Sequence, residues 1–239
     1  MSLPRIEDEI PGTYQLDALL RGRRLQRAWH RARLDLVGCV LPPGLDSLSL
    51  DLAAGAGIVT WRFPKSRVVS IDLRVDACRA IRAHTPGSRA AVAELGLLPF
   101  AAKTFTHLYF LETLEHLTPD QGCQVLEEVR RVSRPGARCL ITTPNYRSHW
   151  VALEWLLDAM RLTPLLANGQ HVSHYDSSTL ARAARAAGWR VVRLGSFNLF
   201  APFAGLVSGT IGAWTVGMEA RRACNAGALL YAVCEAATS

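Results

Sequence analysis

Short apolar runs of strand length recur along the chain, separated by segments whose apolar positions follow a helical period. The runs DSLSLDL and RVVSIDL are bounded by turn-forming residues, and each carries an acid near its end. Continuous apolar runs of this kind are typical of strands that are buried on both faces of a sheet. Strands are expected at residues 46–52, 67–73, 88–95, 105–112, 137–144, 189–195 and 228–236.

Helices are expected between several of these strands, the first over residues 76–84. Thr118 is followed by Pro119 and, three positions on, by Gln121, a capping box with proline at the first helical position. A further helix should stop near Gly188. Strands that alternate with helices predict an α/β fold of Rossmann-like, doubly wound type. We expect a mostly parallel seven-stranded sheet with helices on both faces.

The 239 residues, 49% of them hydrophobic, suffice for one large domain, and no repeat or linker divides the chain. We expect residues 1–45 to form a basic helical cap packed on a main domain of residues 46–239. In such sheets the ligand lies beyond the carboxyl ends of the strands, near the switch point of the topology.

The net charge of +7 comes mainly from one segment, because residues 21–33 hold six arginines and no acid. This pattern indicates a basic helix rather than a nucleic-acid-binding face, so nucleic acid is disfavoured as a partner. The arginines fit a solvated helix face, an anionic substrate or an anionic membrane surface.

The six cysteines are scattered and form no C-x-x-C pair, which argues against a zinc site or a disulfide framework. No metal is expected. The first residues lack the basic-then-apolar order of a signal peptide. We therefore expect a cytoplasmic protein.

Residues 194–218 are uncharged and long enough to span a bilayer. The segment contains Pro202, Asn198 and several glycines, and it follows a predicted strand. We expect a buried segment, an apolar lid or a substrate wall rather than a transmembrane helix. A peripheral contact with a membrane stays open.

A glycine turn follows the first strand, in the sequence DLAAGAG that begins at Asp51. Gly55 and Gly57 permit a tight turn and a close ligand approach to the backbone. Asp72 ends the second strand, where an acid can accept both hydroxyls of a ribose. A dinucleotide fingerprint would need glycine at Thr60, and no P-loop lysine follows, so these residues favour another nucleoside ligand.

Five segments in this order resemble the class I S-adenosylmethionine-dependent methyltransferases, in the small-molecule branch that includes ubiquinone-biosynthesis enzymes. They are DLAAGAG, SIDL, AELGLLPFAAKTFTH, ETLEHL and RRVSRPGARCLITTPN, between about residues 46 and 145. The resemblance implies S-adenosyl-L-methionine as cofactor. Ala53, Glu94 and Thr106 depart from the family pattern and keep a non-catalytic binding module open.

The resemblance also implies roles for individual residues. Gly55 and Gly57, with Ala53 in the place of the first family glycine, would contact the methionine portion of the cofactor. Asp51 would orient the loop and the amino group. The other implied contacts are Asp72 at the ribose, Glu94 and Leu95 at the adenine, and Leu111 near the sulfonium, with Leu73 as a further cofactor-binding residue.

Methyl transfer from a sulfonium requires alignment and exclusion of water, and a base helps when a hydroxyl must ionise. His171, His174 and His116 are the candidate bases, each with a structural role as its alternative. A metal on His171 and His174 is disfavoured, because no third ligand accompanies them at helical spacing. Glu112 and Glu115 are expected to serve a helix dipole.

The sequence thus predicts a methyltransferase acting on a small lipophilic acceptor, at oxygen rather than carbon or nitrogen. An RNA methyltransferase is the second hypothesis, motivated by the basic helix. The non-catalytic module is the third. The oligomeric state is left open.

Overall fold

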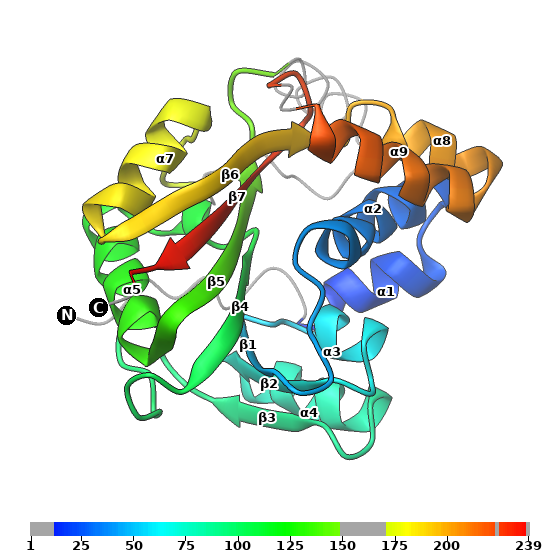
Figure 1. Ribbon diagram of the computed structural model, residues 1–239. Helices are drawn as coiled ribbons and strands as arrows, with labels where there is room; N and C mark the ends of the chain where they lie inside the picture. Colours follow the sequence, from blue (N-terminus) through cyan, green and yellow to red (C-terminus); the bar gives the residue numbers. More distant parts are fainter. Residues whose placement is uncertain (1–11, 149–170, 223–224, 238–239) are drawn as a thin grey trace.

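The computed structural model describes residues 12–148, 171–222 and 225–237, arranged around one central sheet (Figure 1). The seven strands lie in the order β3-β2-β1-β4-β5-β7-β6. They are β1 (Leu48–Leu52), β2 (Arg67–Asp72), β3 (Arg89–Val92), β4 (Phe105–Leu111), β5 (Ser133–Pro144), β6 (Trp189–Phe197) and β7 (Leu229–Ala236). Strand β7 is antiparallel to β5 and β6, and the other neighbouring pairs are parallel. The expected fold class is confirmed.

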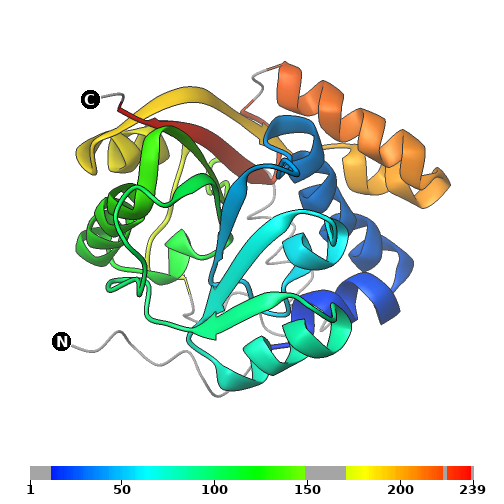
Figure 2. The same cartoon turned by 60° about the horizontal axis from the view of Figure 1, so that its bottom comes forward.

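Helices cover both faces of the sheet (Figure 2). They are α1 (Tyr14–Arg21), α2 (Arg24–Val40), α3 (Ile58–Arg62), α4 (Val75–His84), α5 (Pro119–Val132), α7 (Ser177–Ala186), α8 (Ala201–Val207) and α9 (Gly209–Arg221), with a 3₁₀ turn η1 (Leu114–His116). Helices α5 and α7 bury their apolar sides in the core on one face, and α2 and α9 do so on the other. The capping box of Thr118 and Gln121 forms as predicted.

Strand β5 begins earlier than expected. The sequence predicts a turn over residues 133–138, but Ser133 already pairs with Phe105 of β4. The register then shifts before His107 pairs with Arg138, so the expected turn is an irregularity within the ladder. Gly136 supplies the positive φ of 74° that this irregularity uses.

The basic segment forms the second of two N-terminal helices. Leu36 and Val37 of α2 are fully buried against the sheet, so this helix is part of the main core as well as a cover. Arg33 is buried too, whereas Arg27 and Arg31 are exposed. Residues 1–11 of the expected cap lie outside the described residues.

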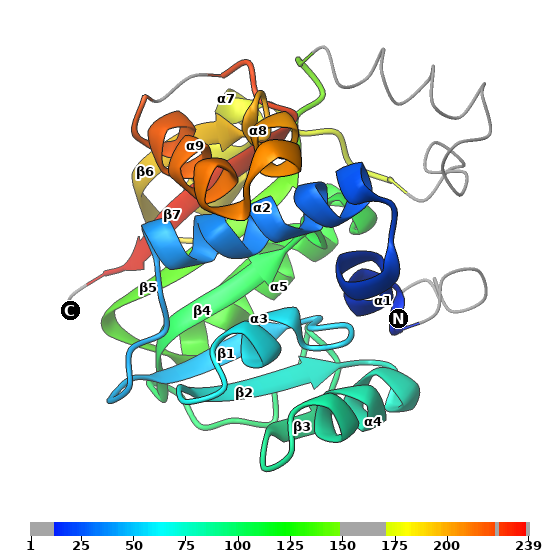
Figure 3. The same ribbon diagram turned by 90° about the vertical axis from the view of Figure 1, so that its right-hand side faces the viewer.

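The uncharged segment 194–218 continues from β6 into a helical hairpin of α8 and α9, which lies along α2 (Figure 3). Among the described residues, no helix combines the length and apolar composition needed to cross a bilayer. Phe197 is buried, but Phe200, Phe203 and Trp214 are 64%, 54% and 63% exposed.

This outward arrangement differs from a buried segment, one of the three expectations, and has a simple packing reason. The hairpin meets its neighbours through small residues. A β-carbon on Gly205 would lie 3.2 Å from Cβ of Ala28, and one on Gly212 would lie 2.9 Å from Cα of Gly205. Such close helix contacts leave the large side chains of the hairpin facing outward.

Candidate active site

The candidate site lies beyond the carboxyl ends of the parallel strands. Strand β1 sits between β2 and β4, so the chain moves outward from β1 in both directions and creates a switch point. The loops that follow β1, β2, β3 and β4 therefore share one edge of the sheet. They carry the residues that the sequence assigned to the cofactor.

The glycine turn after β1 has three residues with left-handed backbone angles. Ala53, Gly55 and Gly57 have φ of 50°, 53° and 71°. At Gly57 a β-carbon would also lie 2.7 Å from Cγ1 of Ile81, so glycine is required there for space as well. Ala53 tolerates its β-carbon at the cost of backbone strain.

Asp72 ties the second strand to this turn. Its Oδ2 accepts a 2.8 Å hydrogen bond from the backbone N–H of Gly55, and its Oδ1 accepts one of 2.9 Å from Arg74. Burial raises the pKa of this carboxyl, and the two backbone hydrogen bonds oppose that rise. A carboxylate has further lone pairs, so the two hydroxyls of a ribose fit here.

Asp51 is only 3% exposed, and its Oδ2 has no hydrogen-bond partner among the described residues. Burial and the nearby Asp72 raise its pKa to about 8. A buried carboxylate oxygen without a partner is costly unless a ligand satisfies it. The ammonium group of a methionine moiety fits this position, so these residues suit the cofactor that the sequence implied.

Leu73 follows β2, and the two residues expected at the adenine, Glu94 and Leu95, follow β3. The N–H of Ala93 bonds the carbonyl of Asp72 at 3.1 Å, which joins the two loops. Leu73 and Glu94 are exposed and Leu95 is half-buried, so their side chains are available to a ligand. Leu111 ends β4 and is nearly buried.

Glu115 lies buried in the 3₁₀ turn η1, and Glu112 lies half-buried just before that turn. Oε2 of Glu115 accepts a 3.1 Å hydrogen bond from Thr143, and the side chain is buried. Burial raises the pKa of both carboxyls, and the positive charge of Arg33 opposes the rise. Glu112 has a φ of 50°, a strained angle of the kind found at functional sites.

Arg33 was not identified as a site residue from the sequence. Its position could have been found, because it shares a helical spacing with His30 and Val37, both on the buried side of α2. Nη2 of Arg33 contacts Nδ1 of His30, and burial lowers the pKa of that histidine to about 2. The positive charge of this buried guanidinium interacts electrostatically with the carboxyls of Glu112 and Glu115.

The three candidate histidines come together near Tyr146. The rings of His116 and His171 lie 5.1 Å apart, and Tyr146 stacks on His174 at 4.1 Å. The hydroxyl of Tyr146 contacts Nδ1 of His171. Tyr146 was not identified as a site residue from the sequence.

Burial and the two neighbouring imidazoles lower the pKa of His171 to about 4. His171 is therefore neutral at neutral pH and a weak proton acceptor. The cluster offers polar contacts for an acceptor at the edge of the sheet that also carries the glycine turn.

Comparison with known proteins agrees with this geometry. A family model described as a methyltransferase domain matches residues 22–194. A demethylmenaquinone methyltransferase of Mycobacterium sp. (strain JLS) is 30% identical over 202 residues, covering 78% of this chain and 84% of that one.

Solved structures show the same fold at low identity. A SAM dependent methyltransferase from Archaeoglobus fulgidus aligns with a TM-score of 0.64 and 14% identity, covering 93% of this chain and 98% of that one. A structure from Haloferax volcanii, titled as the complex of the Trm112 methyltransferase activator with the putative methyltransferase, aligns at 0.62 with 18% identity, covering 96% of this chain and 100% of that one. The chain therefore belongs to the class I S-adenosylmethionine-dependent methyltransferases, in the branch of the quinone-biosynthesis enzymes, and S-adenosylmethionine is its cofactor.

Proposed function

We propose that this enzyme methylates a hydroxyl oxygen of a lipophilic aromatic small molecule of the quinone-precursor class. The observation that carries the proposal is the cluster of His116, His171, His174 and Tyr146 at the edge of the sheet where the glycine turn also lies. S-adenosylmethionine supplies an activated methyl group. The chain has to orient the acceptor oxygen and exclude water.

In this proposal the cofactor is held by the residues that the resemblance assigned. Oδ2 of Asp51 accepts from the amino group, and Asp72 accepts from the ribose hydroxyls. Support comes from the unpartnered oxygen of Asp51 and from the direct contact between Asp72 and Gly55.

Two observations favour a lipophilic acceptor. The relative from Mycobacterium is named for demethylmenaquinone, a lipophilic quinone. The α8–α9 hairpin also presents exposed apolar side chains beside basic ones, which suits peripheral contact with an anionic membrane where such acceptors dissolve. The exposed apolar residues of the hairpin are Phe200, Phe203, Leu206, Val207, Ile211 and Trp214.

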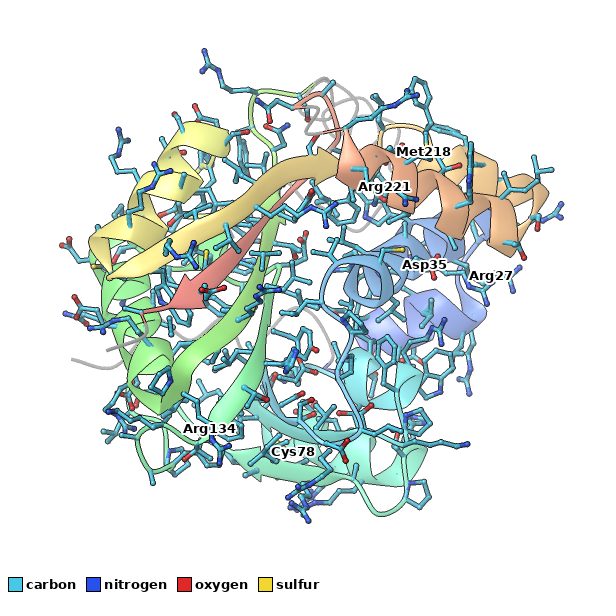
Figure 4. The ribbon with its side chains drawn as sticks, viewed as in Figure 1. Arg27, Asp35, Cys78, Arg134, Met218 and Arg221 are labelled. Atoms are coloured by element: carbon cyan, nitrogen blue, oxygen red, sulfur yellow. The ribbon has the colours of Figure 1, made fainter. Side chains whose placement is uncertain are left out.

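Basic residues border that hairpin. A β-carbon built on Gly209 would lie 2.9 Å from Nη1 of Arg31, so this guanidinium lies against the turn between α8 and α9. Figure 4 shows Arg27 of α2 and Arg221 of α9 on the same side of the molecule. Glu219, the acid of α9, is engaged with the backbone N–H groups of residues 199–201.

The test is an assay of S-adenosylhomocysteine release with matched acceptors: a long-chain hydroquinone, its O-methylated form and a short polar phenol. We expect turnover of the lipophilic hydroquinone and a product methylated at oxygen by mass spectrometry and NMR. Equal turnover of the O-methylated form, or a product methylated at carbon, would overturn the oxygen assignment. A preference for the polar phenol would overturn the proposal of a lipophilic acceptor.

An RNA acceptor is the second candidate, because the arginines of residues 21–31 are exposed. Their confinement to one helical segment argues against a continuous RNA-binding face. Methylation of total RNA that falls steeply with salt would favour this candidate over the first.

A further inference from the structure

We infer that Glu115, His116 and His171 form a binding site for one divalent transition-metal ion. Each residue offers one ligand atom, and these atoms all lie within 4.8 Å of one another. Two imidazoles with one carboxylate form a ligand set that suits zinc, iron and manganese and leaves coordination positions open. This set cannot be found from local spacing, because Glu115 and His116 belong to the 3₁₀ turn η1 and lie far from His171 along the chain.

Backbone contacts fix the spacing of these ligands. The carbonyl of Glu115 accepts hydrogen bonds from the N–H groups of Val172 and Ser173, at 2.8 and 3.0 Å. The hydroxyl of Ser173 donates to the carbonyl of Leu117 at 2.6 Å. The segment that carries His171 is thus clamped to the 3₁₀ turn that carries Glu115 and His116.

The side chains of the ligands are also oriented by neighbours. Thr143 donates to Oε2 of Glu115, and Tyr146 contacts Nδ1 of His171, which leaves Nε2 of that ring for an ion. Metal-binding histidines and carboxylates generally have such outer partners, and loss of a partner typically weakens affinity by about 10–100-fold.

A further buried carboxyl oxygen lies close to these ligands along the chain. Oε1 of Glu112, three residues before Glu115, is buried and has no hydrogen-bond partner within the described residues. A buried polar atom without a partner is costly, and a cation bound at Glu115 would offset part of that cost.

The role of the ion rests on the proposed function, although the binding site does not. Bound to the ion, the acceptor hydroxyl releases its proton to solvent at a lowered pKa. The oxygen then forms a bond to the methyl carbon as the carbon–sulfur bond breaks, and the electron pair of that bond moves to sulfur. His171 serves in this scheme as a ligand of the ion rather than as the base.

Ion binding is tested first, on the full chain after chelator dialysis, by competition between the protein and a chromogenic chelator for Zn²⁺. We expect one ion per chain, and an affinity at least tenfold weaker in His116→Ala and in His171→Ala. Tyr146→Phe should show an intermediate loss. His84→Ala, an exposed histidine on α4, is the matched control and should bind as the wild type does.

The wild type and each variant are checked for S-adenosylmethionine binding by calorimetry, which shows that the chain is folded. A folded wild type that binds no Zn²⁺, Mn²⁺ or Co²⁺ would overturn the site. So would a His171→Ala variant that binds as tightly as the wild type.

Turnover of a phenolic acceptor then separates the two proposals. Chelation should reduce the rate at least tenfold, and the added ion should restore it, while cofactor affinity stays unchanged. Full activity after verified ion removal would overturn the role of the ion. Ion binding without any methylation of hydroxyl acceptors would leave the site standing and overturn the proposed function.

Discussion

The backbone N–H of Gly55 donates a 2.8 Å hydrogen bond to Oδ2 of Asp72, 17 residues further along the chain. This contact joins the glycine turn after β1 to the acid that ends β2. Two motifs that are separate in the sequence therefore act as one unit. The carboxylate that would hold a ribose also fixes the loop that would hold the methionine portion.

Asp72→Asn should weaken S-adenosylmethionine binding by about 10–100-fold, because hydrogen bonds to a charged group contribute roughly 1.5–3 kcal/mol. Calorimetry at neutral pH measures the change. Asp76→Asn is the control, since this neighbouring carboxyl is exposed and paired with Arg74. Equal affinities for Asp72→Asn and the wild type would remove Asp72 from the cofactor site.

Ala53→Gly should stabilise the fold by up to about 1 kcal/mol. The left-handed angle costs an L-residue about 1–2 kcal/mol, which exceeds the roughly 0.5–1 kcal/mol of extra chain entropy that glycine brings. Urea denaturation measures the difference. Ala54→Gly, at the adjacent buried position without a positive φ, should instead destabilise. Destabilisation by both variants would show that Ala53 carries no strain.

Asp51→Asn should become more stable relative to the wild type as pH rises. The pKa of Asp51 is about 8 in the folded protein, against about 3.9 in an unfolded chain. Between these values the folded state holds a proton that the unfolded state releases. The stability of the wild type therefore falls across this window, by at most about 1.4 kcal/mol per pH unit from this one group.

Urea denaturation of both proteins at pH 5 and pH 7.5 gives this difference, with the exposed carboxyl variant Asp46→Asn as control. A stability difference between Asp51→Asn and the wild type that stays constant with pH would contradict the prediction. Asp51→Asn should also lose cofactor affinity, because an amide cannot pair with an ammonium group as a carboxylate does.

The double variant Phe203→Glu with Val207→Glu should bind anionic phospholipid vesicles at least tenfold more weakly than the wild type. Both side chains are exposed on α8, and the guanidinium of Arg31 lies against Gly209, where the next helix begins. Vesicle sedimentation at low and moderate salt measures the binding. Leu97→Glu, at an apolar position 77% exposed in the loop after β3, is the control. An equal loss of vesicle binding in the double variant and in Leu97→Glu would show that the hairpin makes no specific contact with lipid.

The sequence determined the elements of the fold and the nucleoside half of the site. The strands that end near Asp51 and Asp72, and the glycine turn between them, could be predicted from the sequence. Their causes, the burial pattern of a strand and the backbone freedom of glycine, act over only a few residues. Local rules of this kind also placed the capping box at Thr118. They predicted the seven strands and the edge of the sheet at which the ligand would lie.

The tertiary structure decided the other half of the site and the surface. The charge of Arg33 on α2 interacts with the carboxyls of Glu112 and Glu115, and His171 meets His116 through the clamp on the carbonyl of Glu115. Such partners depend on how helices and loops pack against the sheet, and no periodicity along the chain records them. The same holds for the apolar segment 194–218, whose small residues pack inward and leave Phe200, Phe203 and Trp214 exposed.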